Sequence, residues 1–165
     1  MIYLDSAATS LLRPDTVAEA VCKAIRELGS VSRGSYPAAL EAARLVYHTR
    51  QLVAELFHAA GPECVAFTAN ATEALNIVLQ GLFSAGDVVL TTVLEHNSVL
   101  RPLYRLESQG IHSILQDADA QGNVDYEQLA QILHSNPRIA AVVTTHASNL
   151  TGNRVDLARI GALCA

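Results

Sequence analysis

The chain has 165 residues, a formal net charge of −5 and 50% hydrophobic residues, and 16% of its residues are charged. This length is enough for one domain with a substantial buried core, and the apolar content excludes a disordered chain. Lysine and arginine are spaced singly along the sequence. The chain therefore lacks the basic stripe that is typical of nucleic-acid-binding proteins.

The sequence shows no targeting or membrane signal. Residues 1–5 meet an acidic side chain at once, and no apolar stretch approaches the roughly 18 residues that a membrane span needs. The three cysteines, Cys22, Cys64 and Cys164, are odd in number and widely spaced. This pattern argues against a disulfide framework and fits a reducing compartment. We therefore expect a cytoplasmic protein that binds neither membranes nor nucleic acids.

The first third of the chain predicts two helices. Pro14 opens the first, and Gly29 ends it. A loop over residues 30–36 leads into a long helix from about Pro37 to His58. Residues 1–60 are thus predicted to be an N-terminal helical segment, and residues 61–165 the first part of a second domain.

Short apolar runs alternate with helical patterns from residue 61 onward. The runs predict strands at 65–68, 88–92, 111–115 and 139–144, and the helical patterns predict helices at 71–83, 98–108, 125–133 and from about 156 to the last residue. This alternation indicates a three-layer α/β domain with a mostly parallel sheet covered on both faces. Right-handed crossovers bring the C-terminal ends of such strands to one edge, where ligands usually bind.

The first predicted strand end lies at residues 68–72. Small residues at a strand-to-helix turn leave backbone amides free at the positive end of the helix dipole, an arrangement that binds phosphate, and Thr72 adds a hydroxyl. An ordinary helix cap is the alternative, with Asn70 as the N-cap and Glu73 completing a capping box.

Two further strand ends carry polar side chains. His96 could stack on a flat cofactor ring or transfer protons, or it could be a solvated loop histidine beside a helix cap. The amide of Asn149 could hold a ligand oxygen, or it could bond to its own turn. The six histidines are dispersed, without an HExxH or paired Cys/His spacing, so no metal site is predicted.

Five motifs occur in a fixed order along the chain: YLDSAATS at 3–10, RGSY at 33–36, FTANATEALN at 67–76, EHNS at 95–98 and HASNLTG at 146–152. Together they resemble the class V aminotransferase family, and cysteine desulfurases in particular. The resemblance covers the whole chain. By contrast, the absence of a G-x-G-x-x-G motif and of a P-loop disfavours a nucleotide-binding domain.

The resemblance implies an incomplete large domain of the pyridoxal-phosphate-dependent transferase (aspartate aminotransferase-like) fold. Pyridoxal 5′-phosphate (PLP) would be the cofactor. Ala71 and Thr72 would then hold its phosphate, and His96 would stack on its ring as a catalytic residue. Asn149 would contact the ring oxygen or the substrate carboxylate, and Arg33 would lie near the substrate.

The implied activity takes sulfur from L-cysteine and leaves alanine and a protein persulfide, with a sulfur-acceptor protein as a further partner and a homodimer as the full-length parent. Selenocysteine lyases, aminotransferases and epimerases share these motifs, and a noncatalytic module that binds a phosphate or a partner is the alternative from another class. The Schiff-base lysine and the persulfide cysteine of the family are expected beyond Ala165. Lys23, the single lysine, lies in a predicted helix, so we expect the chain to be inactive by itself.

Overall fold

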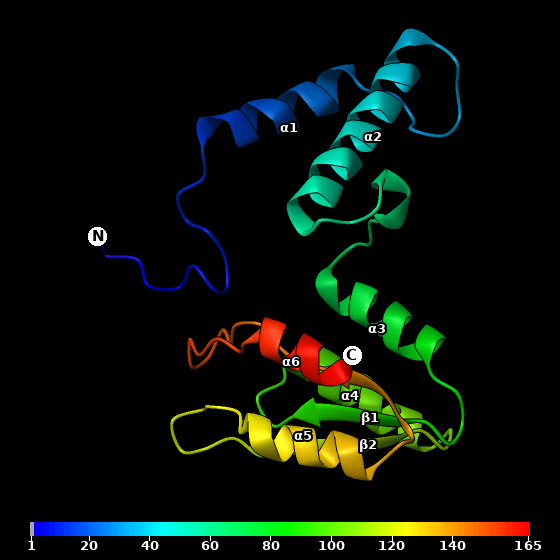
Figure 1. Cartoon of the computed structure of the whole chain (residues 1–165). Helices are drawn as coiled ribbons and strands as arrows, with labels where there is room; N and C mark the ends of the chain where they lie inside the picture. The colour runs from blue at the N-terminus through cyan, green and yellow to red at the C-terminus, as the bar shows by residue number, and fades with distance from the viewer. Residues whose placement is uncertain (1) are drawn as a thin grey trace. The chain divides into compact units, whose positions relative to one another are not determined.

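Among residues 2–165, which this computed structural model describes, three strands pair in parallel: β1 (Val88–Thr92), β2 (His112–Gln116) and β3 (Ile139–Val143). The strand order is β2-β1-β3, so β1 is the central strand. The chain divides into two units, one ending at Phe67 and one spanning Thr68–Ala165, and the sheet belongs to the second unit (Figure 1).

Four helices cover the two faces of this sheet: α3 (Ala71–Leu82), α4 (Asn97–Glu107), α5 (Tyr126–Ser135) and α6 (Leu157–Cys164). Val89 of β1 packs in one apolar cluster with α3 and α4, whereas the next residue, Leu90, packs in a second cluster with α5 and α6. Because successive side chains of a strand point to opposite faces, this division places one helical layer on each face. The predicted three-layer α/β architecture with a parallel sheet is confirmed.

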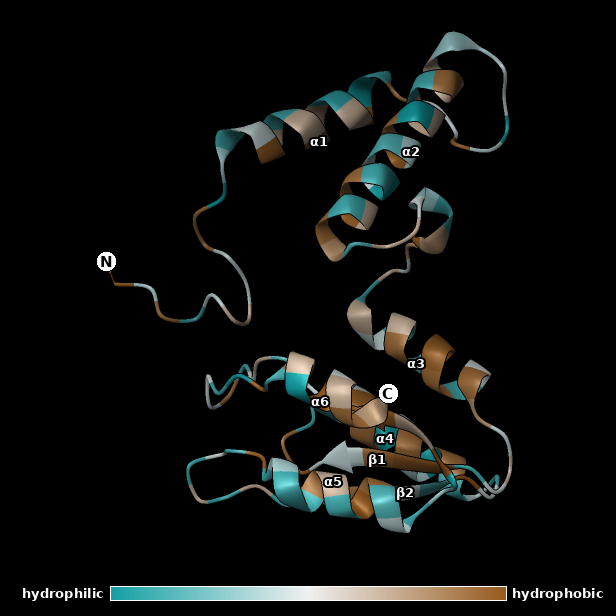
Figure 2. Cartoon of the chain, viewed as in Figure 1, coloured by the Kyte–Doolittle hydropathy of each residue, from teal (hydrophilic) through white to brown (hydrophobic). Residues whose placement is uncertain are grey.

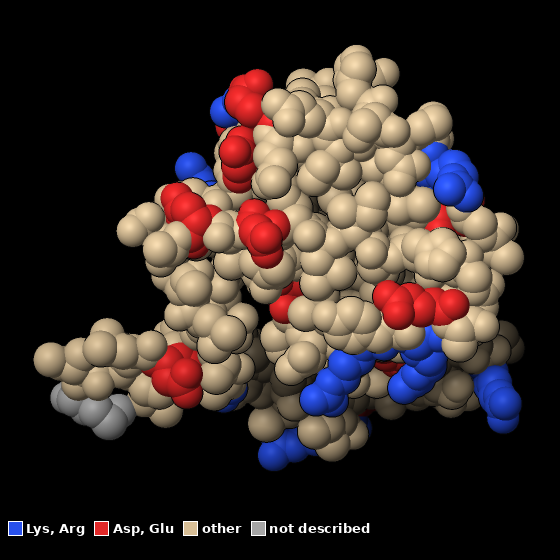
Figure 3. Space-filling view, turned by 90° about the horizontal axis from the view of Figure 1, so that it is seen from below, with Lys and Arg blue, Asp and Glu red and all other residues tan. Residues whose placement is uncertain are grey.

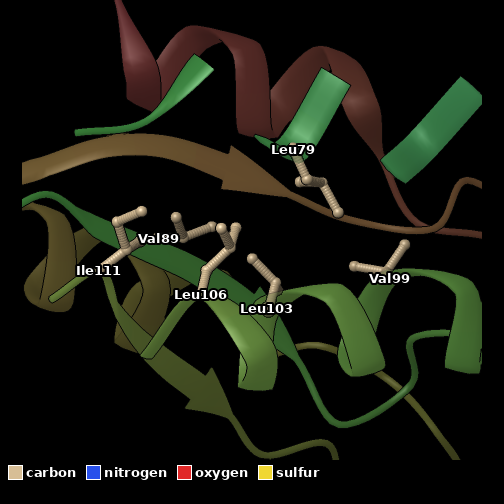
Figure 4. Close-up of a cluster of buried hydrophobic side chains, with 6 residues drawn as sticks. All are labelled: Leu79, Val89, Val99, Leu103, Leu106 and Ile111. Carbon is tan, nitrogen blue, oxygen red and sulfur yellow. The ribbon is translucent and has the colours of Figure 1, made fainter. Parts of the chain in front are cut away.

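The cluster on the α3 and α4 face contains six buried side chains from four segments of the chain (Figure 4): Leu79, Val89, Val99, Leu103, Leu106 and Ile111. Their spacing along α4 places Val99, Leu103 and Leu106 on one side of that helix. Burial of these residues holds α3 and α4 against β1, and this packing positions the N-terminal ends of both helices.

Buried polar groups of β1 are hydrogen-bonded at the C-terminal end of the strand. Thr91 donates its hydroxyl to the carbonyl of Val143 at 2.8 Å, and Thr92 donates its hydroxyl to the carboxylate of Glu95 at 2.9 Å. Both threonines are at most 2% exposed. Since an unpaired buried hydroxyl would be costly, these bonds allow polar residues to end a fully buried strand.

The first unit contains α1 (Asp15–Glu27), α2 (Pro37–Phe57) and a short 3-10 helix (Pro62–Cys64). No residue of α1 is buried, and α2 buries three alanines: Ala39, Ala42 and Ala54. Figure 2 shows hydrophobic residues along α1, α2 and α3. Several of them are largely exposed, including Leu56, Phe57 and Leu82.

The strand predicted at residues 65–68 is wrong. No strand is assigned there within the described residues, and Phe67 is 51% exposed. An apolar run becomes a strand only when a neighbouring strand satisfies its backbone groups, and no described segment pairs with this one. Cys64 accordingly ends a 3-10 helix, and all three cysteines are exposed.

Charged side chains form small groups of either sign on the face drawn in Figure 3, with uncharged atoms over most of it. Two ion pairs occur within the described residues, Arg44–Glu41 and Arg159–Glu127, and both are exposed. No helix of the described chain is long and apolar enough to cross a membrane.

The packing around Leu103 gives a stability test. Leu103 is 1% exposed and lies at the centre of the α3 and α4 cluster, so Leu103→Ala should lower the free energy of unfolding by about 2–5 kcal/mol. Leu82, a helical leucine that is 65% exposed, is the matched control, and Leu82→Ala should cost far less. Urea unfolding followed by circular dichroism measures both. Equal losses for the two variants would contradict this core.

Candidate functional site

The N-terminal end of α3 presents free backbone amides. Ala71 and Thr72 are the first two residues of the helix, where N–H groups have no acceptor inside the helix, and neither amide donates to an acceptor within residues 2–165. Asn70 is the N-cap, and its side chain accepts from the amide of Glu73 at 2.9 Å. The carboxylate of Glu73 in turn accepts from the amide of Ala69 at 2.7 Å.

This end of α3 thus contains the cap that the sequence offered as an alternative to a phosphate site. The two interpretations are compatible, because the cap uses the amides of Ala69 and Glu73 and leaves those of Ala71 and Thr72 free. Free amides at the positive end of a helix dipole attract an anion.

His96 is itself the N-cap of α4. Its ring nitrogen Nδ1 accepts from the amide of Ser98 at 3.1 Å and lies 2.8 Å from the Ser98 hydroxyl. Because Nδ1 accepts a hydrogen bond, the proton of the neutral ring is on Nε2. The side chain is exposed, so its ring face and its Nε2–H group are available to a ligand.

A cavity of about 300 Å³ joins the two helix ends. Thr72 and Asn76 of α3 line it together with His96 and residues spread along α4, from its first residue to its last turn: Asn97, Ser98, Arg101, Pro102 and Arg105. The structure therefore brings together two of the residues predicted for the site, Thr72 and His96. Asn76, Arg101 and Arg105 were not foreseen from the sequence.

The cavity suits an anionic ligand that carries a flat ring. Arg101 and Arg105 lie one turn apart on α4, neither forms an ion pair within residues 2–165, and no described carboxylate lines the cavity. Guanidinium groups, free amides and hydroxyls are donors for a phosphate, and an exposed imidazole can stack on a ring. These residues thus fit a phosphorylated ring compound such as PLP. A signal was present in the sequence, since Arg101 and Arg105 are four residues apart in the helix that follows His96 and so lie on the same side of it.

Asn149 follows β3 and lies at the same edge of the sheet as His96, because β1 and β3 are parallel neighbours. It is an exposed residue in a turn that is closed by a hydrogen bond from the amide of Gly152 to the carbonyl of Ser148, at 2.9 Å. Asn149 does not line the cavity with Thr72 and His96. Its side chain forms no hydrogen bond within residues 2–165, so it does not bond to its own turn.

Arg33 and Lys23 belong to the first unit of the chain. Arg33 lies in the loop between α1 and α2, and its side chain is exposed. Lys23 lies in α1 and is also exposed. Within the part of the chain that the structure describes, no group of three or more histidine, cysteine or acidic side chains could hold a metal ion.

Glu95 is a residue of this edge that the sequence interpretation missed. It lies between β1 and His96, is 8% exposed, and accepts two hydrogen bonds at Oε1: one from the amide of Thr145 at 2.7 Å and one from the hydroxyl of Thr92 at 2.9 Å. Burial raises the pKa of Glu95 above its ordinary value, and the hydrogen bonds from Thr145 and Thr92 offset part of that rise.

Comparison with known sequences shows the family to which this arrangement belongs. The profile of the family described as Aminotransferase class-V matches residues 2–165. The chain is a member of the class V aminotransferase family. A probable cysteine desulfurase of Methanothermobacter thermautotrophicus is 35% identical over 98% of this chain, which corresponds to 40% of the length of that relative.

Solved structures give the same result for the fold. The apo structure of a cysteine desulfurase from Thermococcus onnurineus has a TM-score of 0.89 and 30% identity over 98% of this chain and 40% of that chain. A structure of the C-DES protein, with glycine covalently linked to its PLP cofactor, has a TM-score of 0.82 and 27% identity over 98% of this chain and 42% of that chain. The chain thus spans about 40% of the length of the proteins that it matches and has the fold of PLP-dependent enzymes.

The raised pKa of Glu95 predicts a pH-dependent contribution to stability. Between the unfolded-state pKa and the higher folded-state pKa, the folded chain binds the proton more tightly, so the free energy of unfolding should fall as pH rises through that window. Below the unfolded-state pKa the contribution is fully present. Glu95→Gln should remove this part of the pH dependence.

Urea unfolding at a series of pH values, for the wild type and for Glu95→Gln, measures that difference. Glu107→Gln, at an exposed position near the end of α4, is the control and should leave the wild-type dependence unchanged. If Glu95→Gln and the wild type show the same dependence, the carboxyl of Glu95 does not titrate differently in the folded chain.

Proposed function

We propose that this chain is the cofactor-binding N-terminal part of a PLP-dependent cysteine desulfurase. The observation that carries the proposal is the cavity between α3 and α4, where Thr72, His96, Arg101 and Arg105 line one space with hydrogen-bond donors and an imidazole. The matched cysteine desulfurases support the choice of activity within the family.

Four residues of the cavity, together with Ala71 directly before Thr72, have proposed roles in holding the cofactor. The amides of Ala71 and Thr72 and the Thr72 hydroxyl bind the phosphate, and the two arginines of α4 add positive charge at this edge. The ring of His96, which the bond from the Ser98 amide orients, stacks on the pyridine ring and offers Nε2–H for proton transfer. When bound, PLP withdraws electrons from the amino acid that is attached to it.

The overall reaction moves one sulfur atom. The bond between the β-carbon and the sulfur of L-cysteine breaks, the sulfur passes to a protein thiolate as a persulfide, and the β-carbon takes up a proton to give alanine. Asn149 is proposed to contact the ring oxygen of the cofactor or the substrate carboxylate, and Arg33 is proposed to lie near the substrate. Both side chains are exposed, and both are hydrogen-bond donors that suit an anion.

The covalent steps need groups that this chain does not provide in a suitable setting. A lysine that forms a Schiff base needs a pKa lowered by a desolvated or cationic environment, and Lys23 is an exposed residue of α1. We therefore propose that the chain alone has no turnover. The complete enzyme is proposed to be a cytoplasmic homodimer that passes sulfur to an acceptor protein, and the free state of all three cysteines fits a reducing compartment.

Two substitutions test the roles of His96 and Thr72 in the full-length protein that carries this segment. His96→Ala should lower turnover by about 10²–10⁴-fold, because positioned proton transfer is lost, and should affect cofactor retention less. Thr72→Val should weaken cofactor binding by at most roughly 1.5–3 kcal/mol, because the backbone amides and the helix dipole remain. Alanine release measures turnover, and cofactor absorbance measures retention.

The exposed His134 of α5 gives a matched control, and His134→Ala should change neither quantity. Production of sulfide and alanine from cysteine separates a desulfurase from an aminotransferase or an epimerase, and a much higher rate with selenocysteine would indicate a selenocysteine lyase. The proposed roles are wrong if His96→Ala keeps full turnover while Thr72→Val abolishes it.

A further inference from the structure

Glu95 is the one acidic side chain that is buried among residues 2–165. It immediately precedes His96, which is the N-cap of α4. Burial of a carboxylate is costly unless hydrogen bonds compensate for the lost hydration. The hydrogen-bond partners of Glu95 therefore show which parts of the chain the buried carboxylate connects. Both partners of Oε1 lie at the C-terminal edge of the sheet.

The carboxylate joins two loops that are 50 residues apart in the sequence. Thr92 ends β1, and its hydroxyl donates to Glu95 Oε1, while the amide of Thr145, two residues beyond the end of β3, donates to the same oxygen. The ladder between β1 and β3 ends at the pair Thr91 and Val143. Glu95 therefore connects the segments that follow β1 and β3, beyond the point where backbone pairing between the two strands stops.

The loop that begins at Thr145 is held together by its own hydrogen bonds. The amide of Val155 donates to the carbonyl of His146, and the amide of Ser148 donates to the carbonyl of Asn153, both at 2.9 Å. Because the segment is internally bonded, a shift at Thr145 moves the turn that carries Asn149. On the other side of the bridge, Glu95 is covalently bonded to His96, the cap of α4.

We propose that Glu95 is a positioning residue, whose carboxylate fixes the separation of the His96 loop and the Asn149 loop at the edge of the sheet where the cofactor binds. The proposal rests on the proposed function for its effect on turnover, whereas the bridge itself is a property of the chain. A hydrogen bond to a charged group is shorter and roughly twice as strong as a neutral one. This strength suits the bond from Thr145, which is the bond of Glu95 that reaches the other loop.

The bridge is tested in the chain without cofactor, by NMR of the ¹⁵N-labelled protein. The amide proton of Thr145 should shift as the pH is lowered, since it donates to a carboxylate that becomes protonated, and this titration should be absent in E95Q. The other acid–base side chains on the two loops, His96, His146 and Asp156, are unchanged in E95Q, so any shift that they cause at Thr145 is present in both proteins. A Thr145 shift that is the same in the wild type and in E95Q overturns the bridge.

The positioning role is tested in the full-length, PLP-loaded protein. E95A and E95D should lower kcat by about 10²-fold with KM changed less, because a displaced catalytic group loses rate without losing binding. E95D keeps the charge but is one methylene short of Thr145, whereas E95Q keeps an oxygen that can accept both bonds and should lose less. E107A, at an exposed position of α4, is the control.

The outcomes of the two tests are separable. Wild-type kcat in E95D, with Thr145 no longer bonded in its NMR spectrum, overturns the positioning role. If E95A does not fold, as judged by circular dichroism, then E95D and E95Q decide the result. A wild-type protein that releases no alanine from cysteine overturns the proposed function, and the Thr145 titration then still decides whether Glu95 bridges the loops.

Discussion

The burial of β1 on both faces and both edges is the constraint on which the rest of the structure depends. All five of its residues are buried, and β2 and β3 pair with it in parallel on either side. A strand enclosed in this way can lie only between two helical layers, so α3 and α4 are fixed on one face, and α5 and α6 on the other. Its C-terminal end, followed by Glu95 and His96, is thereby brought to the edge where β3 also ends.

The site follows from that constraint because its donors belong to helix ends and loops that the sheet positions. The N-terminal ends of α3 and α4 meet at one cavity, which gathers free amides, a capping imidazole and two arginines in a chain of net negative charge. Arg101 and Arg105, one turn apart on α4, place two positive charges at this cavity, and no carboxylate of the described residues lines it. This local positive charge favours the binding of a phosphate-bearing ligand.

Most of the fold could be predicted from the sequence because its elements are short and strongly patterned. The starts of α3 and of the last helix are marked by Asn70 and Asp156, which cap them, and β1 has the predicted bounds. The strand prediction at residues 65–68 failed, because an apolar run forms a strand only if a neighbouring strand pairs with it. Glu95 belongs to a recognised motif, but its contact could not be predicted from the sequence, because the Thr145 amide that donates to it is 50 residues away.

The central claim, that the cavity between α3 and α4 binds the phosphate and ring of PLP, is tested most directly by titrating the ¹⁵N-labelled chain with 4-deoxypyridoxine 5′-phosphate. This analogue keeps the ring and the phosphate but lacks the aldehyde, so it cannot react with Lys23. The account predicts saturable shifts of the amide signals of Ala71, Thr72 and His96, which Thr72→Val weakens. Shifts confined to residues around Lys23, or no shift at the ends of α3 and α4, would contradict it.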